Sequence, residues 1–179
     1  DVPVPAPYND FYNYTELGLF ADYVILMAYD EHYGQQSGAG SVASLSWTKE
    51  AVDNLLAENV PADQIVFGIP FYTKLWKLTP TTDEATNGNY MVAFENLNMN
   101  KAKEWMTNNI DEWTWLEDCG QYYGETVQNG ITYKMWLEDT SSLEQRLQLM
   151  KEYSLAGAAF WKIGLESDNA WDTIIKFIN

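Results

Sequence analysis

The 179-residue sequence has too few cysteine, histidine and basic residues for several classes of protein. Cys119 is the one cysteine and His32 the one histidine, which excludes an intrachain disulfide and a zinc site built from cysteines and histidines. Ten basic residues against 26 acidic ones give a net charge of −16 at pH 7. This charge repels phosphate backbones and anionic lipids, so we expect no nucleic-acid partner. We also expect no metal and no cofactor.

The sequence also lacks a long hydrophobic run. No stretch approaches the roughly 20 apolar residues that span a membrane, so no membrane insertion is expected. Apolar residues nevertheless make up 46% and aromatic residues 15% of the chain, which is enough for a packed core and excludes disorder as the main state. The length suits one ordinary domain.

Short apolar runs and amphipathic stretches alternate along the chain. Runs that are almost continuously apolar predict buried strands of a parallel sheet, at residues 23–29, 65–72 and 158–163. Apolar residues at helical spacing predict helices at residues 47–59, 141–154 and 170–178, with Ser46 and Ser141 as the expected N-caps of the first two. The sequence therefore predicts an α/β fold with parallel strands.

The interval between the second and third strands is too long for one crossover helix. It predicts a small α+β insertion, with a helix at residues 101–110 and strands at 113–116, 122–127 and 131–137. Asn129-Gly130 is a strong signal for a hairpin between the last two strands. The acidic pairs Glu117-Asp118 and Glu138-Asp139 are expected to be solvated. We divide the chain into residues 1–74, the insertion 75–137, and residues 138–179.

Candidate functional residues stand where the predicted strands end. Parallel α/β folds bind ligands at the carboxyl ends of their strands, where this chain carries Met27, Tyr29, Asp30, Tyr72 and Trp161. Aromatic rings stack on the C–H faces of sugars, and carboxylates accept hydrogen bonds from sugar hydroxyls. The residues alone leave other interpretations open: Met27 as core filler, Asp30 as a turn residue, and Trp161 as a packing plug.

Three motifs in order resemble glycoside hydrolase family 18. Residues 21–32, ADYVILMAYDEH, resemble strand six of that family with its M-x-Y-D motif, and the added E-H resembles its bacterial branch of spore-cortex peptidoglycan N-acetylglucosaminidases. Residues 66–72, VFGIPFY, resemble strand seven, and residues 157–166, GAAFWKIGLE, resemble strand eight. The resemblance implies a TIM barrel, and the insertion lies where the family has one, between strands seven and eight.

The resemblance also implies roles for the candidate residues. In this family the N-acetyl group of the substrate attacks the anomeric carbon. By resemblance, Tyr29 orients that acetamido group, Asp30 contacts the sugar in the cleavage subsite, and Met27 lines the floor of the subsite. Trp161 would lie under the sugar, and Tyr72 would be a further contact. Glu31 and His32 match the branch signature without an assigned role.

One family motif is missing from the chain. The general acid of the family is the glutamate of D-x-x-D-x-D-x-E at strand four, and no such motif occurs between Asp1 and Asn179. Residues 2–7, VPVPAP, resemble the end of strand five, so the sequence predicts the C-terminal half of a barrel, a fold that needs about 250 residues when complete. The expected function is therefore the C-terminal part of a glycosidase that acts on chitin or peptidoglycan and is inactive alone.

Two alternatives remain. One is a non-catalytic carbohydrate-binding module of the same fold, and the other is a structural adaptor whose aromatic residues are all core. A half-barrel would leave strand edges and apolar surface exposed, so we expect either self-association or a completing N-terminal half-barrel. Family resemblance alone places the protein outside the cell, in the cell wall or spore envelope.

Overall fold

Three parallel strands form the first sheet of the computed structural model, which describes residues 12–82 and 90–178. Their order is β1 (Val24–Leu26), β2 (Ile65–Pro70) and β8 (Gly157–Trp161), so the predicted parallel strands are present but shorter than expected. The segment expected to end strand five, residues 2–7, lies outside the described residues. In the described part of the chain, no strand pairs with the outer edge of β1 or of β8.

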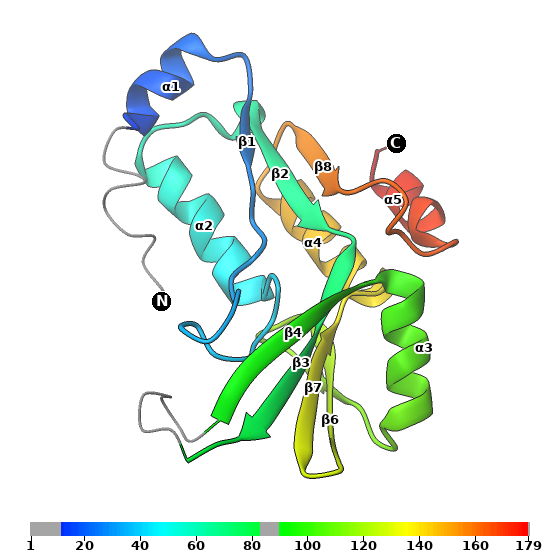
Figure 1. Ribbon diagram of the computed structural model, residues 1–179. Helices are drawn as coiled ribbons and strands as arrows, with labels where there is room; N and C mark the ends of the chain where they lie inside the picture. Colours follow the sequence, from blue (N-terminus) through cyan, green and yellow to red (C-terminus); the bar gives the residue numbers. More distant parts are fainter. Residues whose placement is uncertain (1–11, 83–89, 179) are drawn as a thin grey trace.

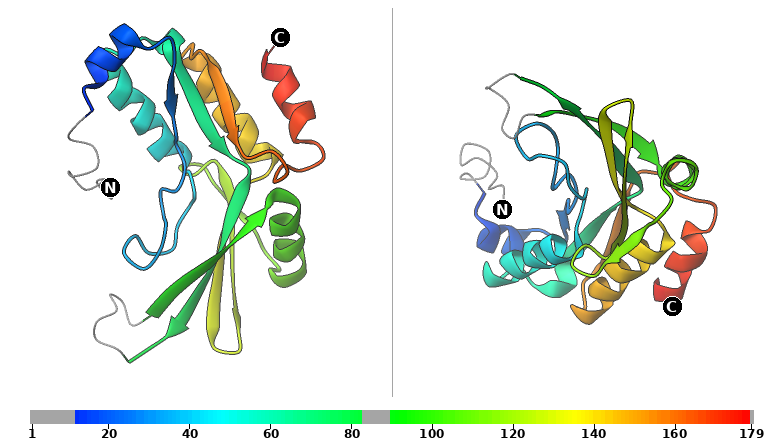
Figure 2. Two further views of the ribbon diagram at one scale, coloured as in Figure 1. Left: turned by 45° about the horizontal axis from the view of Figure 1, so that its top comes forward. Right: turned by 90° about the horizontal axis from the view of Figure 1, so that it is seen from below.

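Helices cover one face of this sheet, as Figures 1 and 2 show. They are α2 (Leu45–Ala57), α4 (Thr140–Glu152) and α5 (Ala170–Ile178). Two shorter helices precede strands: α1 (Tyr14–Phe20) precedes β1, and the 3-10 helix η2 (Ala62–Gln64) precedes β2. Their apolar faces and the covered side of β2 form one core cluster, which includes Val52, Phe67, Ile69, Leu143, Leu147 and Ile174. Burial of this apolar surface holds the helices on the sheet.

Among the described residues, no helix or strand covers the opposite face of the parallel sheet, which we call the bare face. Side chains alternate across a strand, so Tyr23, Ile25 and Met27 point away from the helices and are 62 to 67% exposed. Trp161, at the end of β8, is 54% exposed. Because soluble proteins rarely expose contiguous apolar surface of this kind, this face is a candidate contact surface.

A five-stranded antiparallel sheet lies beyond the carboxyl ends of the parallel strands (Figure 1), in the order β4-β3-β7-β6-β5. We call the three-stranded sheet with its helices the parallel layer, and this five-stranded sheet the antiparallel layer. The helix α3 (Met99–Asn109) packs on one of its faces and shares a core with Leu75, Met106 and Met135. The Asn129-Gly130 turn joins β6 to β7 with φ values of 51° and 78°, the left-handed conformation expected of this pair. The strands are β3 (Tyr72–Pro80), β4 (Tyr90–Asn98), β5 (Thr114–Leu116), β6 (Gln121–Gln128) and β7 (Ile131–Leu137).

The second sheet differs from the sequence prediction in one respect. β3 and β4 pair along nine residues, yet neither was predicted. The second apolar run, expected to continue to residue 72, breaks after Pro70, and Tyr72 begins β3 of the antiparallel sheet. The proposed division of the chain at residues 74 and 137 stays a prediction.

The helix caps also differ from those expected. Ser44, not Ser46, caps α2, and Asp139, not Ser141, caps α4 through a reciprocal capping box with Ser142. Glu138 and Asp139 were expected to be solvated, but both are buried. Asp139 is buried because it satisfies the first amides of α4, and Glu138 because it pairs with Arg146, with 3.0 Å between Glu138 Oε1 and Arg146 Nη2.

Backbone hydrogen bonds join the two layers. The amides of Leu45 and Ser46, in the first turn of α2, donate to the carbonyls of Cys119 (2.9 Å) and Asp118 (3.0 Å) in the antiparallel layer. These amides have no partner within their own helix, so the insertion completes the helix terminus. The Phe71 amide, between β2 and β3, donates to the carbonyl of Trp161 at 2.7 Å.

The loop from residue 31 to residue 44 lies against the antiparallel sheet (Figure 1). The Trp76 indole Nε1 donates to the Gly40 carbonyl at 2.7 Å, and a Cβ at Gly40 would lie 2.5 Å from the His32 ring, so this position requires glycine. At the tip of the loop, the Gln35 amide pairs with the backbone of edge strand β4. Its Nε2 donates to the Tyr90 carbonyl at 3.1 Å, and its Oε1 accepts from the Val92 amide at 2.6 Å.

Candidate functional site

Asp30 lies four residues after the end of β1, in the left-handed backbone region with φ of 64°. A short polar side chain tolerates this conformation better than most residues. Its carboxylate Oδ1 accepts hydrogen bonds from the Tyr72 hydroxyl at 2.7 Å and from the Lys74 ammonium. Two residues of the antiparallel sheet therefore hold the carboxylate that follows the first parallel strand.

Lys74 is a site residue that the sequence patterns did not indicate. Its side chain is 2% exposed, and its Nζ donates to the His32 carbonyl at 2.7 Å as well as to Asp30. Nζ also lies 5.0 Å from the centre of the Phe94 ring, within range of a cation–π contact. No sequence pattern distinguishes Lys74 from Lys77 in the same strand, whose side chain is 38% exposed, because a lysine is buried only where tertiary partners satisfy its charge.

A pocket of about 260 Å³ opens beside Asp30. The structure brings three predicted residues together in its lining, Asp30, Tyr72 and Trp161, and adds others from β4 and from the segment after β8. The added residues are Asn96, Leu97, Asn98, Lys162 and Leu165. The amides of Asn96 and Asn98 supply both donors and acceptors, so the pocket can form hydrogen bonds with a polar ligand.

The other two predicted residues, Met27 and Tyr29, lie outside the pocket lining. Tyr29 stacks with Trp161, with 6.4 Å between ring centres and 28° between planes. Met27 is on the bare sheet face, and neither Met27 nor Tyr29 lines the pocket. Gly68 allows this arrangement, because a Cβ there would lie 2.5 Å from the Leu26 carbonyl oxygen and 3.2 Å from the Tyr29 ring.

Both tyrosines of the site remain neutral hydrogen-bond donors. Burial raises the pKa of Tyr72 well above its usual value, and the hydrogen bond to Asp30 raises it further. Burial and the charge of Asp30 also raise the pKa of Tyr29. A phenol that keeps its proton can donate to an amide oxygen at any ordinary pH.

Glu31 and His32, which had no assigned role, fix the loop behind the site. The Glu31 carboxylate accepts from the Ser44 amide at 2.7 Å and from the Ser44 hydroxyl at 3.0 Å, at the start of α2. His32 Nδ1 lies 3.1 Å from the Ser41 carbonyl. Both residues therefore have structural contacts that hold the chain next to Asp30.

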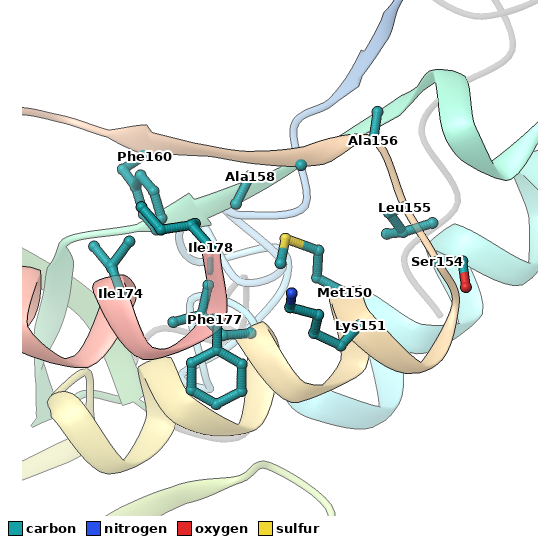
Figure 3. A pocket seen from close by; sticks show the side chains of 12 residues that line it. Met150, Lys151, Ser154, Leu155, Ala156, Ala158, Phe160, Ile174, Phe177 and Ile178 are labelled. Carbon is teal, nitrogen blue, oxygen red and sulfur yellow. The ribbon is translucent and has the colours of Figure 1, made fainter.

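A larger pocket of about 410 Å³ lies elsewhere, between β8, α4 and α5 (Figure 3). Apart from Lys151 and Ser154 its lining is apolar, with Met150, Phe160 and Phe177 among the side chains. It contains no carboxylate, so it is not the candidate site. Within residues 12–82 and 90–178, no group of three histidine, cysteine or acidic residues could hold a metal, and no helix is long and apolar enough to cross a membrane.

Comparisons with known proteins show what the chain resembles. The chain is 27% identical over 166 residues to YvbX of Bacillus subtilis, an uncharacterised glycosylase, and the match covers 92% of the chain and 45% of that relative. The spore cortex-lytic enzyme SleL of Bacillus megaterium superposes with a TM-score of 0.76 at 20% identity, over 94% of this chain and 36% of SleL. Human YKL-39, described as a pseudo-chitinase with retained chitooligosaccharide binding, superposes with a TM-score of 0.71 at 18% identity, over 92% and 52% of the two chains.

The chain thus spans about half or less of the length of each of these proteins. The structural likeness confirms the expected fold class, the C-terminal half of a (β/α)8 barrel that carries an α+β insertion. The model of the family described as glycosyl hydrolases family 18 matches residues 1–166. Because this match extends over most of the sequence, the chain belongs to glycosyl hydrolases family 18.

Proposed function

We propose that the chain forms the sugar-binding edge of a glycosidase that hydrolyses β-linked N-acetylglucosamine polymers, chitin or peptidoglycan, by substrate-assisted retention. The observation that carries the proposal is the pairing of a half-exposed tryptophan with a carboxylate at one pocket. Trp161 presents an aromatic face, and Asp30 presents a carboxylate that is 53% exposed. A pyranose needs both an apolar platform and strong acceptors for its hydroxyls.

Each predicted residue has a role in this proposal. Trp161 stacks under the sugar in the cleavage subsite, and Met27 contributes to the floor beside it. Tyr29, which remains protonated, donates to the acetamido oxygen and orients that oxygen for attack on the anomeric carbon. Asp30 accepts from the sugar or its N-acetyl N–H, while Tyr72 and Lys74 keep the carboxylate in place.

The chain lacks the D-x-x-D-x-D-x-E motif that carries the general acid. Loss of general acid catalysis lowers rates by about 10²- to 10⁴-fold, so we expect this chain alone to bind sugars without efficient turnover. The second candidate function is a non-catalytic carbohydrate-binding module of the same fold. Human YKL-39, which has a similar fold, is described as a pseudo-chitinase that retains chitooligosaccharide binding, so binding without turnover has a precedent on this fold.

A binding experiment tests the proposal. N-acetylglucosamine oligomers and peptidoglycan fragments would be titrated into the chain by calorimetry. Trp161→Ala is expected to weaken the better ligand by about ten-fold or more, because stacking on a sugar is lost. Trp115→Ala in β5, outside the pocket lining, is the matched control and should change affinity by less than about two-fold. A wild-type chain that binds neither glycan would contradict the proposal.

A chromogenic N-acetylglucosamine oligomer separates the two candidate functions. We expect no turnover from the chain alone, and clear turnover would contradict a missing general acid. Turnover that appears when an N-terminal half carrying the acidic motif is added would support the glycosidase. Continued inactivity with intact binding would support the binding module.

The proposal also includes a partner and a location. Ile25 and the unpaired edges of β1 and β8 would be covered by further strands, from a second copy or from an N-terminal half-barrel. The proposed substrate, chitin or peptidoglycan, would place the protein in the cell wall or spore envelope.

A further inference from the structure

Glu138 lies between β7 and α4 and is buried with both of its carboxylate oxygens in use. Oε1 accepts from Gln121 Nε2 at 2.7 Å and from Arg146 Nη2 at 3.0 Å, and Oε2 accepts from the Ser142 hydroxyl at 2.8 Å. Arg146 is itself fully buried. A buried ion pair contributes little net stability compared with apolar packing, so its presence raises the question of what it positions.

Side-chain hydrogen bonds lead from Glu138 to the candidate site. Gln121 Oε1 accepts from the Ser41 hydroxyl at 2.5 Å, and the Ser41 carbonyl is 3.1 Å from His32 Nδ1. The His32 carbonyl in turn accepts from Lys74 Nζ at 2.7 Å, and the same Nζ contacts Asp30. The path runs through β6 and the loop before α2 and reaches the site carboxylate.

A second path runs through the backbone. The Glu138 amide donates to Thr73 Oγ1 at 2.9 Å, and Thr73 stands in β3 between Tyr72 and Lys74. Arg146 Nη2 also donates to the Ala43 carbonyl in the loop before α2. Glu138 and its partner therefore contact both segments that place the Lys74 ammonium, the β3 strand and the loop.

We propose that Glu138 is a positioning residue of the candidate site: through Gln121, Ser41 and Thr73 it sets where Lys74 and the His32 carbonyl meet, and so orients Asp30. The side chain does not line the pocket. A buried network in which both carboxylate oxygens have partners admits few alternative arrangements, which makes it suited to holding a distant carboxylate. The consequence for glycan affinity rests on the proposed function.

A double-mutant cycle tests the proposal. Glu138→Gln keeps the shape of the side chain but leaves the Arg146 charge without its partner. We expect affinity for an N-acetylglucosamine oligomer to fall about ten-fold, whereas in a Lys74→Met background the same change should lower it less than about two-fold. Equal losses in both backgrounds, or unchanged affinity with a lower melting temperature, would show that Glu138 is only structural.

Two further variants keep the test decisive. Glu125→Gln removes a carboxylate of the insertion whose partners, Lys134 at 3.2 Å and the Tyr123 hydroxyl, do not line the pocket, and it should leave affinity unchanged. If Glu138→Gln does not fold, Ser41→Ala removes one link of the path and is expected to weaken binding about three-fold.

Amide NMR shifts separate this proposal from the proposed function. Measured without sugar, the Asp30 and Lys74 amide signals should move in Ser41→Ala and stay in place in Glu125→Gln. Unmoved signals would overturn the positioning role. Shifted signals in a chain that binds no glycan would support the positioning role while the proposed function fails.

Discussion

The parallel and antiparallel layers differ in how completely they bury their apolar surface. In the antiparallel layer, α3 covers one face and the loop that contains Gly40 lies on the other, where Trp76 is fully buried. In the parallel layer, helices cover one face and leave Ile25, Met27 and Trp161 more than half exposed on the other. The antiparallel layer thus has cover on both faces within the described residues, although Met91 and Val127 at its margins are more than half exposed, whereas the parallel sheet has cover on one face only.

The candidate site lies where these two layers meet. Asp30 follows a strand of the parallel layer, which is covered on one face, and Tyr72 and Lys74 come from the antiparallel layer, which is covered on both. A rigid support behind a ligand contact reduces the disorder that binding must overcome. Strand β3 of the antiparallel layer therefore orients a carboxylate at the end of a sheet that is covered on one face only.

The largest expected effect is on the covered face of the parallel layer. Phe67 in β2 is fully buried under the helices, so Phe67→Ala should lower the free energy of unfolding by about 3 to 5 kcal/mol. Chemical denaturation monitored by circular dichroism measures the change. A loss below about 1 kcal/mol would mean that this core contributes little to folding.

The next effect is a pH dependence of the free energy of unfolding that comes from Glu138, between β7 and α4. Burial raises the pKa of Glu138 to about 7, although Arg146 and Ser142 oppose the shift. Because the native state binds this proton more tightly than the unfolded chain, its contribution to stability is complete below about pH 4.5 and is lost as pH rises to about 7.

The measurement compares unfolding free energies of wild type and Glu138→Gln between these two pH values. Wild type should lose stability relative to the variant as pH rises. A relative gain would show that Arg146 dominates and that the Glu138 pKa is lowered.

A smaller effect distinguishes two glycines of the parallel sheet. A Cβ at Gly68 would lie 2.5 Å from the Leu26 carbonyl oxygen, whereas a Cβ at Gly157 meets nothing within 4 Å. Gly68→Ala should therefore destabilise the protein by about 1 to 3 kcal/mol and move Tyr29, while Gly157→Ala should be neutral or slightly stabilising. Thermal unfolding of the two variants measures the difference. Equal melting temperatures would show that Gly68 tolerates a Cβ as well as Gly157 does.

The smallest effect on folding is expected on the bare face. Ile25→Lys should change the free energy of unfolding by less than about 0.5 kcal/mol, because Ile25 is 62% exposed. The same change should lower self-association in light scattering and reduce binding of an apolar dye. A wild-type chain that stays monomeric and binds no dye at high concentration would show that this face needs no cover.

Sequence patterns predicted the parts of the fold that depend on local or continuous signals. The three parallel strands are nearly unbroken apolar runs, and the Asn129-Gly130 turn is specified by its two residues. β3 was missed because both of its faces are partly covered, so apolar and charged residues such as Trp76 and Lys77 follow one another without a clear period. Its partner β4 exposes most of its residues and has no clear apolar face.

The candidate site was predicted only where the chain itself carries a motif. The strand-end rule and the resemblance indicated Asp30 and Trp161, and the structure brings both into one pocket with Tyr72. Lys74 and Glu138 could not be found in this way, because no local sequence pattern indicates the partners that allow their burial. The partner of Lys74 is the His32 carbonyl, and the partner of Glu138 is Arg146. A charged residue in the sequence is read as solvated until a tertiary partner is known.

The hydrogen bonds of Gln35 bear on aggregation. An edge strand offers free amides and carbonyls to any other extended chain, and β4 is the edge strand beside the tip of the loop that carries Gln35. By pairing with Tyr90 and Val92, one side-chain amide occupies a donor and an acceptor that a foreign strand would use. The loop next to the candidate site therefore leaves fewer free backbone groups on this edge for pairing with another chain.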